Sequence, residues 1–455
     1  MGASPLIGTG GLTLTVGQGC RLCAWPFEGP GSHQGRRENH TVKGRSIMGT
    51  SNSGFSDAGL RRLHDVLAQH VESTKIPGLV ALVSRGRQTH VEAIGTMRHD
   101  GGAPMRRDTI FRMASTSKPV TMAAAMILLD ECRLRLDDPV DQWLPELADR
   151  QVLTRPDGPL DDTVPAHRPI TVRDLLTSTF GLGVDFESMA SPIRAATFER
   201  LDYSVASGPA PEPDEWMRRL GELPLQYQPG VRWQYDLSNE VVGVLVSRVT
   251  GQSLETFLRA RILDPLGMKD TAFHVPADKI DRLPPLLGPD PQTGEFLVWD
   301  EAAGGRSSAP PAFQGAGGGL VSTADDYHAY FQMLLNHGMH GSEKILSRAA
   351  VELMTTNRLS PEQLAAREAM FSHVAHLSSG QGANGGWGFG MAVRTYRGDY
   401  APIGQFGWFG GTGTTAYADR TNQLTGVLLT QVGLSTPDSP RAMSDFWTTL
   451  YQAID

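Results

Sequence analysis

Strand-like segments occur near both ends of this 455-residue chain, and helical segments fill the sequence between them. Near the start, Leu79–Ser84 and Thr89–Ile94 flank Gly86, which predicts a β-hairpin. Near the end, Thr414–Ala418 and Leu424–Val432 have the same strand character. The pattern favours an α+β fold in which a mostly helical insertion interrupts one sheet.

Apolar residues at helical spacing predict the helices. Ser56 is a suitable N-cap for a first helix that places Leu60, Leu63, Leu67 and Val71 on one face. Val120–Leu129 is expected to be a buried helix. Further helical windows are Val172–Leu176, Glu240–Val249 and Leu254–Leu266, and a last helix carries Phe446, Leu450 and Ile454.

Residues 1–54 differ from the rest of the chain. They hold 12 Gly and show no helical or alternating apolar period, and five basic residues outnumber two acidic ones. We expect a disordered tail that carries no catalysis. A transit-like segment, or a true start at Met48, is the alternative. Residues 55–455 are expected to form one domain, with a sheet part at about 55–125 and 320–455 and a helical part at about 126–319.

The net charge of -8 argues against nucleic-acid partners and against attraction to anionic lipid. The longest nearly apolar run, Val120–Leu129, is too short to span a membrane. Met1–Gly19 lacks the basic residues of a secretory signal, so a cytoplasmic location is expected. Of three cysteines, Cys20 and Cys23 form a single C-x-x-C that predicts no metal site, and Cys132 is expected to be buried. We expect no cofactor.

One nucleophile pattern is present. The chain has no G-x-S-x-G, H-E-x-x-H or P-loop sequence, but Ser115-Thr116-Ser117-Lys118 is an S-x-x-K. At a helix start, residues i and i+3 share a face, so the amine of Lys118 can lie beside the Ser115 hydroxyl and activate it. About 0.4 such matches arise by chance in a chain of this composition. An ordinary helix N-terminus with a surface lysine is therefore the alternative.

Two further segments strengthen the active-site interpretation. Tyr235 lies at a loop-to-helix junction, where a phenol near an ammonium group can accept and later return a proton. The glycine-rich segment Gly407–Gly413 leads into a strand and can present backbone N–H groups to a ligand. A core tyrosine and a glycine-rich turn are the alternatives.

Seven segments in order resemble one family. They are Phe111–Lys118 (F-R-M-A-S-T-S-K), Leu134–Val140 (L-R-L-D-D-P-V), Ile170–Leu182, Gln228–Tyr235 (Q-P-G-V-R-W-Q-Y), Gly251–Thr271, Gly315–Asp326 and the segment around Trp408. The chain resembles the serine beta-lactamase/penicillin-binding-protein-like superfamily, and most resembles its class C beta-lactamase-like (family VIII) carboxylesterases. That resemblance covers about residues 56–455. It implies a beta-lactamase/transpeptidase-like fold, with an antiparallel sheet flanked by helices and a mostly helical second subdomain.

The resemblance also implies site residues. Ser115 would be the acylated nucleophile, with Lys118 and Tyr235 as its proton-transfer partners; which of the two is the base stays open. The backbone N–H groups of Ser115 and Gly411 would form the oxyanion hole. Trp408 and Gly410 would occupy the third motif of the family.

Departures from the family pattern bear on the substrate. Ser178 stands where relatives often carry His. Leu237 stands where the beta-lactamases and penicillin-binding proteins of the superfamily usually carry Asn, and Trp408 where they carry Lys or His, whereas the family VIII esterases resemble W-x-G there. A lysine at that place would pair with a substrate carboxylate, whereas an indole offers an apolar wall. The sequence therefore favours uncharged esters as substrates.

Several functions remain open. The leading prediction is a metal-free carboxylesterase acting on small-molecule esters. The alternatives are a beta-lactamase or D-alanyl-D-alanine carboxypeptidase, an amide hydrolase or acyltransferase, and a catalytically silent interaction protein on the same fold. Gly183–Leu225 is expected either to cover the site and select the acyl group or to pack onto its own subdomain.

Overall fold

The structure is a computed structural model that describes residues 54–73, 76–184, 190–201, 203–204, 208–209, 211–290, 292–293, 295–372, 385–434 and 438–454. Nearly all of the expected N-terminal tail, together with Cys20 and Cys23, lies outside the described residues. Residues Asn52–Asp455 belong to one compact unit.

An eight-stranded antiparallel sheet has the strand order β14-β15-β16-β17-β18-β1-β2-β3. The strands are β1 (Gly78–Arg85), β2 (Gln88–Arg98), β3 (Gly101–Pro104), β14 (Gly386–Trp387), β15 (Ala392–Val393), β16 (Phe406–Gly410), β17 (Thr414–Asp419) and β18 (Leu424–Thr430). β1 pairs with β18 from Leu79↔Thr430 to Arg85↔Leu424. The prediction that strands from both ends share one sheet is confirmed.

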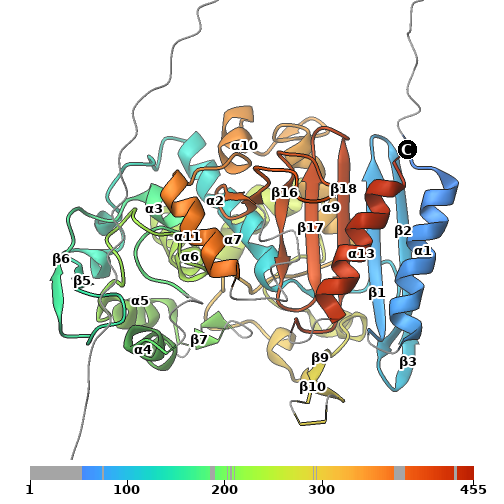
Figure 1. Cartoon of the computed structure of the whole chain (residues 1–455), viewed down its shortest axis with the longest axis horizontal. Coiled ribbons are helices and arrows are strands. Elements are labelled where there is room, and N and C mark those ends of the chain that lie inside the picture. Colours follow the sequence, from blue (N-terminus) through green and yellow to red (C-terminus); the bar gives the residue numbers. More distant parts are fainter. Residues whose placement is uncertain are drawn as a thin grey trace, which may run out of the picture. The chain divides into compact units, whose positions relative to one another are not determined.

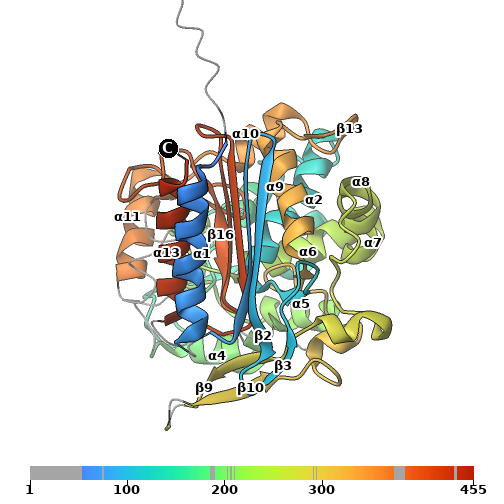
Figure 2. The same ribbon diagram turned by 90° about the vertical axis from the view of Figure 1, so that its right-hand side faces the viewer.

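Helices cover both faces of this sheet. The helices α1 (Asp57–Glu72) and α13 (Asp438–Gln452) pack against each other on one face, as Figures 1 and 2 show. On the opposite face, α9 (Ala324–Leu335) lies against β1, β17 and β18, with α2 (Ser117–Asp130) beside it. The Ser56 side chain accepts a hydrogen bond from the N–H of Gly59, as its predicted capping role requires.

The remaining elements form the helical part and its loops. The helices are α3 (Val172–Leu176), α4 (Pro192–Leu201), α5 (Pro213–Gly221), α6 (Leu237–Thr250), α7 (Leu254–Leu258), α8 (Asp264–Leu266), α10 (Arg348–Met354) and α11 (Pro361–Ser372). Shorter turns are η1 (Ala114–Thr116), η2 (Val140–Gln142), η3 (Pro145–Leu147), the π-turn η4 (Arg259–Leu263), η5 (Ala277–Arg282) and η6 (Arg306–Ser308). Five small antiparallel pairs complete the fold: β4 (Phe111–Arg112) with β11 (Val321–Ser322), β5 (Gln151–Leu153) with β6 (Thr163–Pro165), β7 (Tyr203–Ser204) with β8 (Gly208–Pro209), β9 (Leu286–Pro289) with β10 (Phe296–Asp300), and β12 (Met339–His340) with β13 (Glu343–Lys344).

Two expectations from the sequence need correction. Cys132 is exposed rather than buried, because it follows the end of α2 at φ 57°, where the chain turns away from the core. Trp408 and Gly410 lie inside a strand of their own, β16, rather than in a segment that leads into the next strand. None of the helices in the described part of the chain has the length and apolar character of a membrane span.

Candidate active site

Ser115 lies in the turn η1, which runs directly into helix α2. Residues Ser117–Leu128 of this helix are fully buried, so α2 is a rigid central support for the serine. The preceding residue, Ala114, has φ 45°, a left-handed conformation that a residue with a Cβ adopts at a cost of about 1 kcal/mol or more. Ser115 itself retains 8% of its surface in contact with solvent.

Lys118 contacts three oxygen atoms. Its Nζ lies 2.9 Å from the Oγ of Ser115, 2.6 Å from the carbonyl oxygen of Gly317 and 2.5 Å from Oδ1 of Asp236. An ammonium group has three N–H donors, so these contacts match its capacity. Burial alone would lower the pKa of Lys118, but the charges of Asp236, Tyr235 and Glu240 outweigh burial and raise it.

Tyr235 completes the expected trio. Its ring centroid lies 4.7 Å from Nζ of Lys118, and its Oη accepts a 2.8 Å hydrogen bond from Nε1 of Trp408. The backbone is held by Val184, whose N–H donates to the Tyr235 carbonyl oxygen at 2.8 Å. The residues predicted as nucleophile, proton partners and third motif therefore lie together.

The glycine-rich segment approaches the serine closely. A Cβ at Gly410 would lie 2.3 Å from the carbonyl oxygen of Met113, so only glycine fits in β16 at this point. Gly411, the next residue, is exposed, and a Cβ there would meet nothing within 4 Å. Both expected oxyanion donors, the N–H groups of Ser115 and Gly411, thus lie on segments that are in contact.

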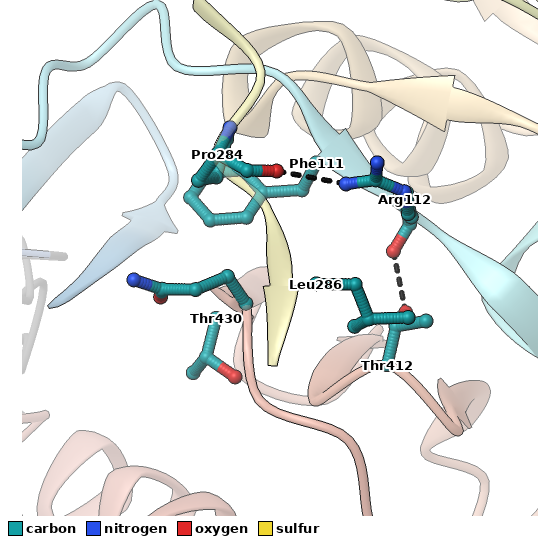
Figure 3. Close-up of a pocket in the computed structure, with 7 residues that line it drawn as sticks. Phe111, Arg112, Pro284, Leu286, Thr412 and Thr430 are labelled. Atoms are coloured by element: carbon teal, nitrogen blue, oxygen red, sulfur yellow. Dashed lines mark hydrogen bonds between the residues drawn. The ribbon is translucent and has the colours of Figure 1, made fainter. Parts of the chain in front are cut away.

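Threonine side chains join these two segments. Thr412 Oγ1 donates to the carbonyl oxygen of Arg112, and Thr414 Oγ1 donates to that of Met113 at 2.9 Å. Figure 3 shows the small pocket beside this junction, which is lined by Phe111, Arg112, Pro284, Leu286, Thr412, Thr430 and Gln431. Arg112 also pairs with Asp300 at 2.7 Å and donates to Pro284, which ties the junction to the β9–β10 hairpin region.

Other aromatic rings pack against Trp408. The guanidinium of Arg367, fully buried on α11, lies within 6 Å of the rings of Trp233, Phe371, Trp387 and Trp408. Its Nη1 donates to the carbonyl oxygen of Gly385 at 2.7 Å. Burial lowers the pKa of Arg367 to about 10. Trp408 is 1% exposed, so the cluster fixes the indole that hydrogen-bonds to Tyr235.

Sequence reasoning missed two buried carboxyl groups. Asp236 and Glu240 lie one turn apart at the start of α6, directly after Tyr235. Glu240 Oε1 accepts the N–H of Gly317 at 3.1 Å, and the carbonyl of Gly317 accepts from Lys118. Burial first, and then the charge of Asp236, raise the pKa of Glu240 to about 8, against the effect of Lys118. The i, i+4 spacing of Asp236 and Glu240 directly after Tyr235 is a sequence pattern that could have identified them as neighbours in the site.

The residues that depart from the family pattern are buried. Leu237 is 0% exposed within α6, and Ser178 Oγ accepts a 3.0 Å hydrogen bond from Ser238 Oγ. In the segment Gly183–Leu225, Trp216 and Met217 pack into the larger core, whereas Val184 packs with Tyr235 and Trp408. Phe186 and Met189 lie outside the described residues. Among the residues that the structure describes, no group of His, Cys, Asp and Glu side chains is arranged to hold a metal ion.

Chemically, the arrangement suits acyl transfer. A serine hydroxyl, a lysine amine, a tyrosine phenol and a glycine-rich backbone segment lie together, and a nucleophilic mechanism can use such groups as nucleophile, proton-transfer partners and oxyanion donors. The buried Trp408 donates a hydrogen bond to Tyr235 beside these groups.

The chain matches the Beta-lactamase family over residues 63–444. Protein Rv1367c of Mycobacterium tuberculosis is 39% identical over 356 residues, which are 77% of this chain and 84% of that protein. Esterase EstB of Burkholderia gladioli is 30% identical over 400 residues, 83% and 92% of the two chains. The solved structure of EstCE1, a hydrolase with promiscuous acyltransferase activity, superposes with a TM-score of 0.69 at 24% identity and covers 87% of this chain and 98% of its own.

Proposed function

This chain belongs to the beta-lactamase family, and we propose that it is a serine carboxylic ester hydrolase that works through an acyl-enzyme on Ser115. The observation that carries the proposal is the 2.9 Å contact between Lys118 Nζ and Ser115 Oγ inside a buried site. Packing alone gives no reason to bury a lysine beside a serine, since a buried amine costs free energy unless it is paired. The similarity to esterase EstB supports the same reaction class.

The proposed reaction has two steps. Ser115 Oγ attacks the ester carbonyl while its proton passes to Lys118 or Tyr235, and the carbonyl oxygen moves toward the N–H groups of Ser115 and Gly411. The alcohol leaves with a proton from the same relay, and an acyl-enzyme remains. Water then attacks the acyl group, which regenerates Ser115.

Uncharged esters fit this site better than lactams. The side chain of Trp408 is buried and donates its only N–H to Tyr235, so it offers no cation to a substrate carboxylate. A beta-lactamase or carboxypeptidase of this family would need such a cation nearby. The second candidate is an acyltransferase, in which an alcohol rather than water takes the acyl group. The similarity to the acyltransferase calJ of Penicillium decumbens, which is 29% identical over 370 residues, supports this candidate.

The experiment compares the wild-type chain with Ser115→Ala on p-nitrophenyl butyrate and on nitrocefin. We expect ester turnover to fall by at least about 10³-fold in Ser115→Ala, because the nucleophile is lost. Mass spectrometry should find a butyryl group on Ser115 of the wild type. Ser347→Ala, the same change at the N-cap of α10, is the matched control and should keep full activity.

Other outcomes would point elsewhere. Strong nitrocefin turnover without ester hydrolysis would replace the esterase with a lactamase. Transfer of the butyryl group to an added alcohol faster than to water would establish the acyltransferase. An ester activity that survives in Ser115→Ala would contradict the proposal altogether.

A further inference from the structure

Asp236 is a charged residue of the site to which the family resemblance gives no role. Its Oδ1 lies 2.5 Å from Nζ of Lys118, and the two side chains are 4% and 0% exposed. The contact is therefore a buried ion pair that involves the lysine of the S-x-x-K motif itself. Removing one partner of such a pair leaves the other charge without compensation.

The backbone of Asp236 shows that the side chain is held in place by its surroundings. Its φ of 89° and ψ of -56° fall in a region that residues other than glycine rarely adopt. Asp236 occupies the N-cap position of α6, where an aspartate normally accepts a hydrogen bond from the first turn of the helix, yet its side chain makes no such bond. The carboxylate is turned to Lys118 instead.

Burial of Lys118 opposes a positive charge, but the charged and polar groups around it favour one. Asp236 and Glu240 approach it from α6, Tyr235 from the preceding loop, and the carbonyl of Gly317 from the loop before β11. Among the residues that the structure describes, Arg367 is a further cation of this region, and its guanidinium lies 5.9 Å from the Trp408 ring centroid. These charges raise the pKa of Lys118 although burial opposes them.

We propose that Asp236 is a positioning residue that holds Lys118 as an ammonium ion, so that Tyr235 rather than Lys118 accepts the proton of Ser115. The inference rests on the acyl-enzyme function proposed above, and it deepens that function by assigning the base. Asp236 acts through Lys118 and does not touch the substrate.

The proton balance of the step is complete. The Oγ–C bond forms, the carbonyl electron pair moves to oxygen, and the Oγ proton passes to the phenolate of Tyr235. When the C–O bond to the alcohol breaks, its electron pair stays on the leaving oxygen, which takes the proton back from Tyr235. Lys118 keeps its three protons and donates a hydrogen bond to Ser115 Oγ throughout, and the Trp408 N–H stabilises the phenolate.

The experiment measures how fast Ser115 reacts at different pH values in Asp236→Asn. The probe is a fluorophosphonate that labels the serine, and labelling rates are recorded from pH 5 to pH 10 beside kcat/KM for p-nitrophenyl butyrate. We expect the alkaline limb of both profiles to move down by at least about one pH unit, because Lys118 loses its proton more readily without Asp236. Because the pKa of Lys118 in the wild type is raised from its ordinary value of 10.5, the two chains should differ most at pH 10 and agree at pH 6–7.

A faster reaction of Ser115 in Asp236→Asn would overturn the inference. If neutral Lys118 were the base, Asp236→Asn would make it available at lower pH and would raise the labelling rate at pH 6–7. A folded variant with an unchanged profile also refutes the role. Asp236→Ser removes the same charge with a smaller side chain and must shift the limb in the same direction.

Two controls separate this effect from a structural one. Asp174→Asn removes another nearly buried carboxylate, which lies on α3 and pairs with Arg168 at 2.6 Å. This variant should leave the alkaline limb in place. Asp236→Glu keeps the charge, so its alkaline limb should lie between those of the wild type and of Asp236→Asn. If the wild type hydrolyses no ester but its Ser115 is still labelled, the proposed function fails while the test of Asp236 remains valid.

Discussion

Glu240 is a carboxyl group that the fold keeps out of water. It has the fully buried Lys118 and Asp236 as charged neighbours, and burial and Asp236 raise its pKa from 4.5 to about 8. The folded protein therefore binds a proton here over a pH range in which the unfolded chain has released it. Stability from this group is fully present below about pH 4.5 and is lost as the pH rises through about 8.

Replacing Glu240 by Gln should remove this pH dependence. Between pH 5 and pH 8.5, the free energy of unfolding of the wild type should fall by a few kcal/mol relative to that of Glu240→Gln. Each unit of pKa shift corresponds to about 1.4 kcal/mol. Glutamine keeps an oxygen that can accept the N–H of Gly317. Urea unfolding of both chains at the two pH values provides the measurement. Parallel stability curves would show that Glu240 has an ordinary pKa in the folded state.

For single residues, the sequence indicated which side chains lie together, but it did not indicate the charges around them. The S-x-x-K spacing, Tyr235 and the segment around Trp408 are visible in the chain, and the structure brings them together. Asp236 was assigned no role from the sequence. Its side chain meets Lys118 only because of a positive φ that sequence patterns do not reveal.

Strand β16 shows how one element sets the geometry of the site. Gly410 lies against Met113 and Thr414, whereas the neighbouring Gly411 faces open space. Gly410→Ala should therefore displace β16 from the serine turn, because its Cβ would lie 2.3 Å from both the Met113 carbonyl oxygen and Thr414 Oγ1. We expect at least about a 10²-fold loss of kcat/KM, as when an oxyanion donor is lost.

The matched variant is Gly411→Ala. It adds the same methyl group one residue later, where nothing lies within 4 Å and φ is not positive. Esterase assays and thermal unfolding of the two variants provide the test. The melting temperatures separate the two variants, because Gly410→Ala should lower the melting temperature and Gly411→Ala should not. Equal melting temperatures would mean that a side chain at Gly410 does not disturb the packing of β16 against Met113.

Prediction of elements succeeded where apolar periodicity was strong. The window Val172–Leu176 is α3, and the buried run from Val120 became the body of α2. The strands β14 and β15 were not predicted, because two residues are too few to show an alternation of apolar and polar side chains. In β16 the glycines that allow close packing resemble a turn, so the strand was expected to begin after them.

Across the whole molecule, the two ends of the described domain meet. The N–H of Ser56 donates to the carbonyl oxygen of Ala453 at 2.9 Å, and Arg85 Nη1 donates to the carbonyl oxygens of Gly54 and Ile454. The sequence indicated a shared sheet through strands at both ends. It gave no direct sign of this contact between α1 and α13, because the two helices are separated by nearly the whole domain.

A circular permutant would test this arrangement. We expect a chain that joins residue 455 to residue 54 by a short glycine-serine linker, and opens in the exposed β12–β13 turn at Gly341, to fold and keep its ester activity. Its melting temperature should lie within a few degrees of that of a linear chain of residues 54–455. An insoluble or inactive permutant, beside a folded linear control, would show that folding requires the natural order of the elements along the chain.

The pairing of β1 with β18 also has a consequence during synthesis. Arg85 faces Leu424 in the sheet, so the first hairpin leaves the ribosome about 340 residues before the strand that covers its open edge. At roughly 5–20 residues per second, that edge waits about 20–70 s for its partner. A nascent chain with an unpaired apolar strand such as β1 is a substrate for chaperones and a starting point for aggregation.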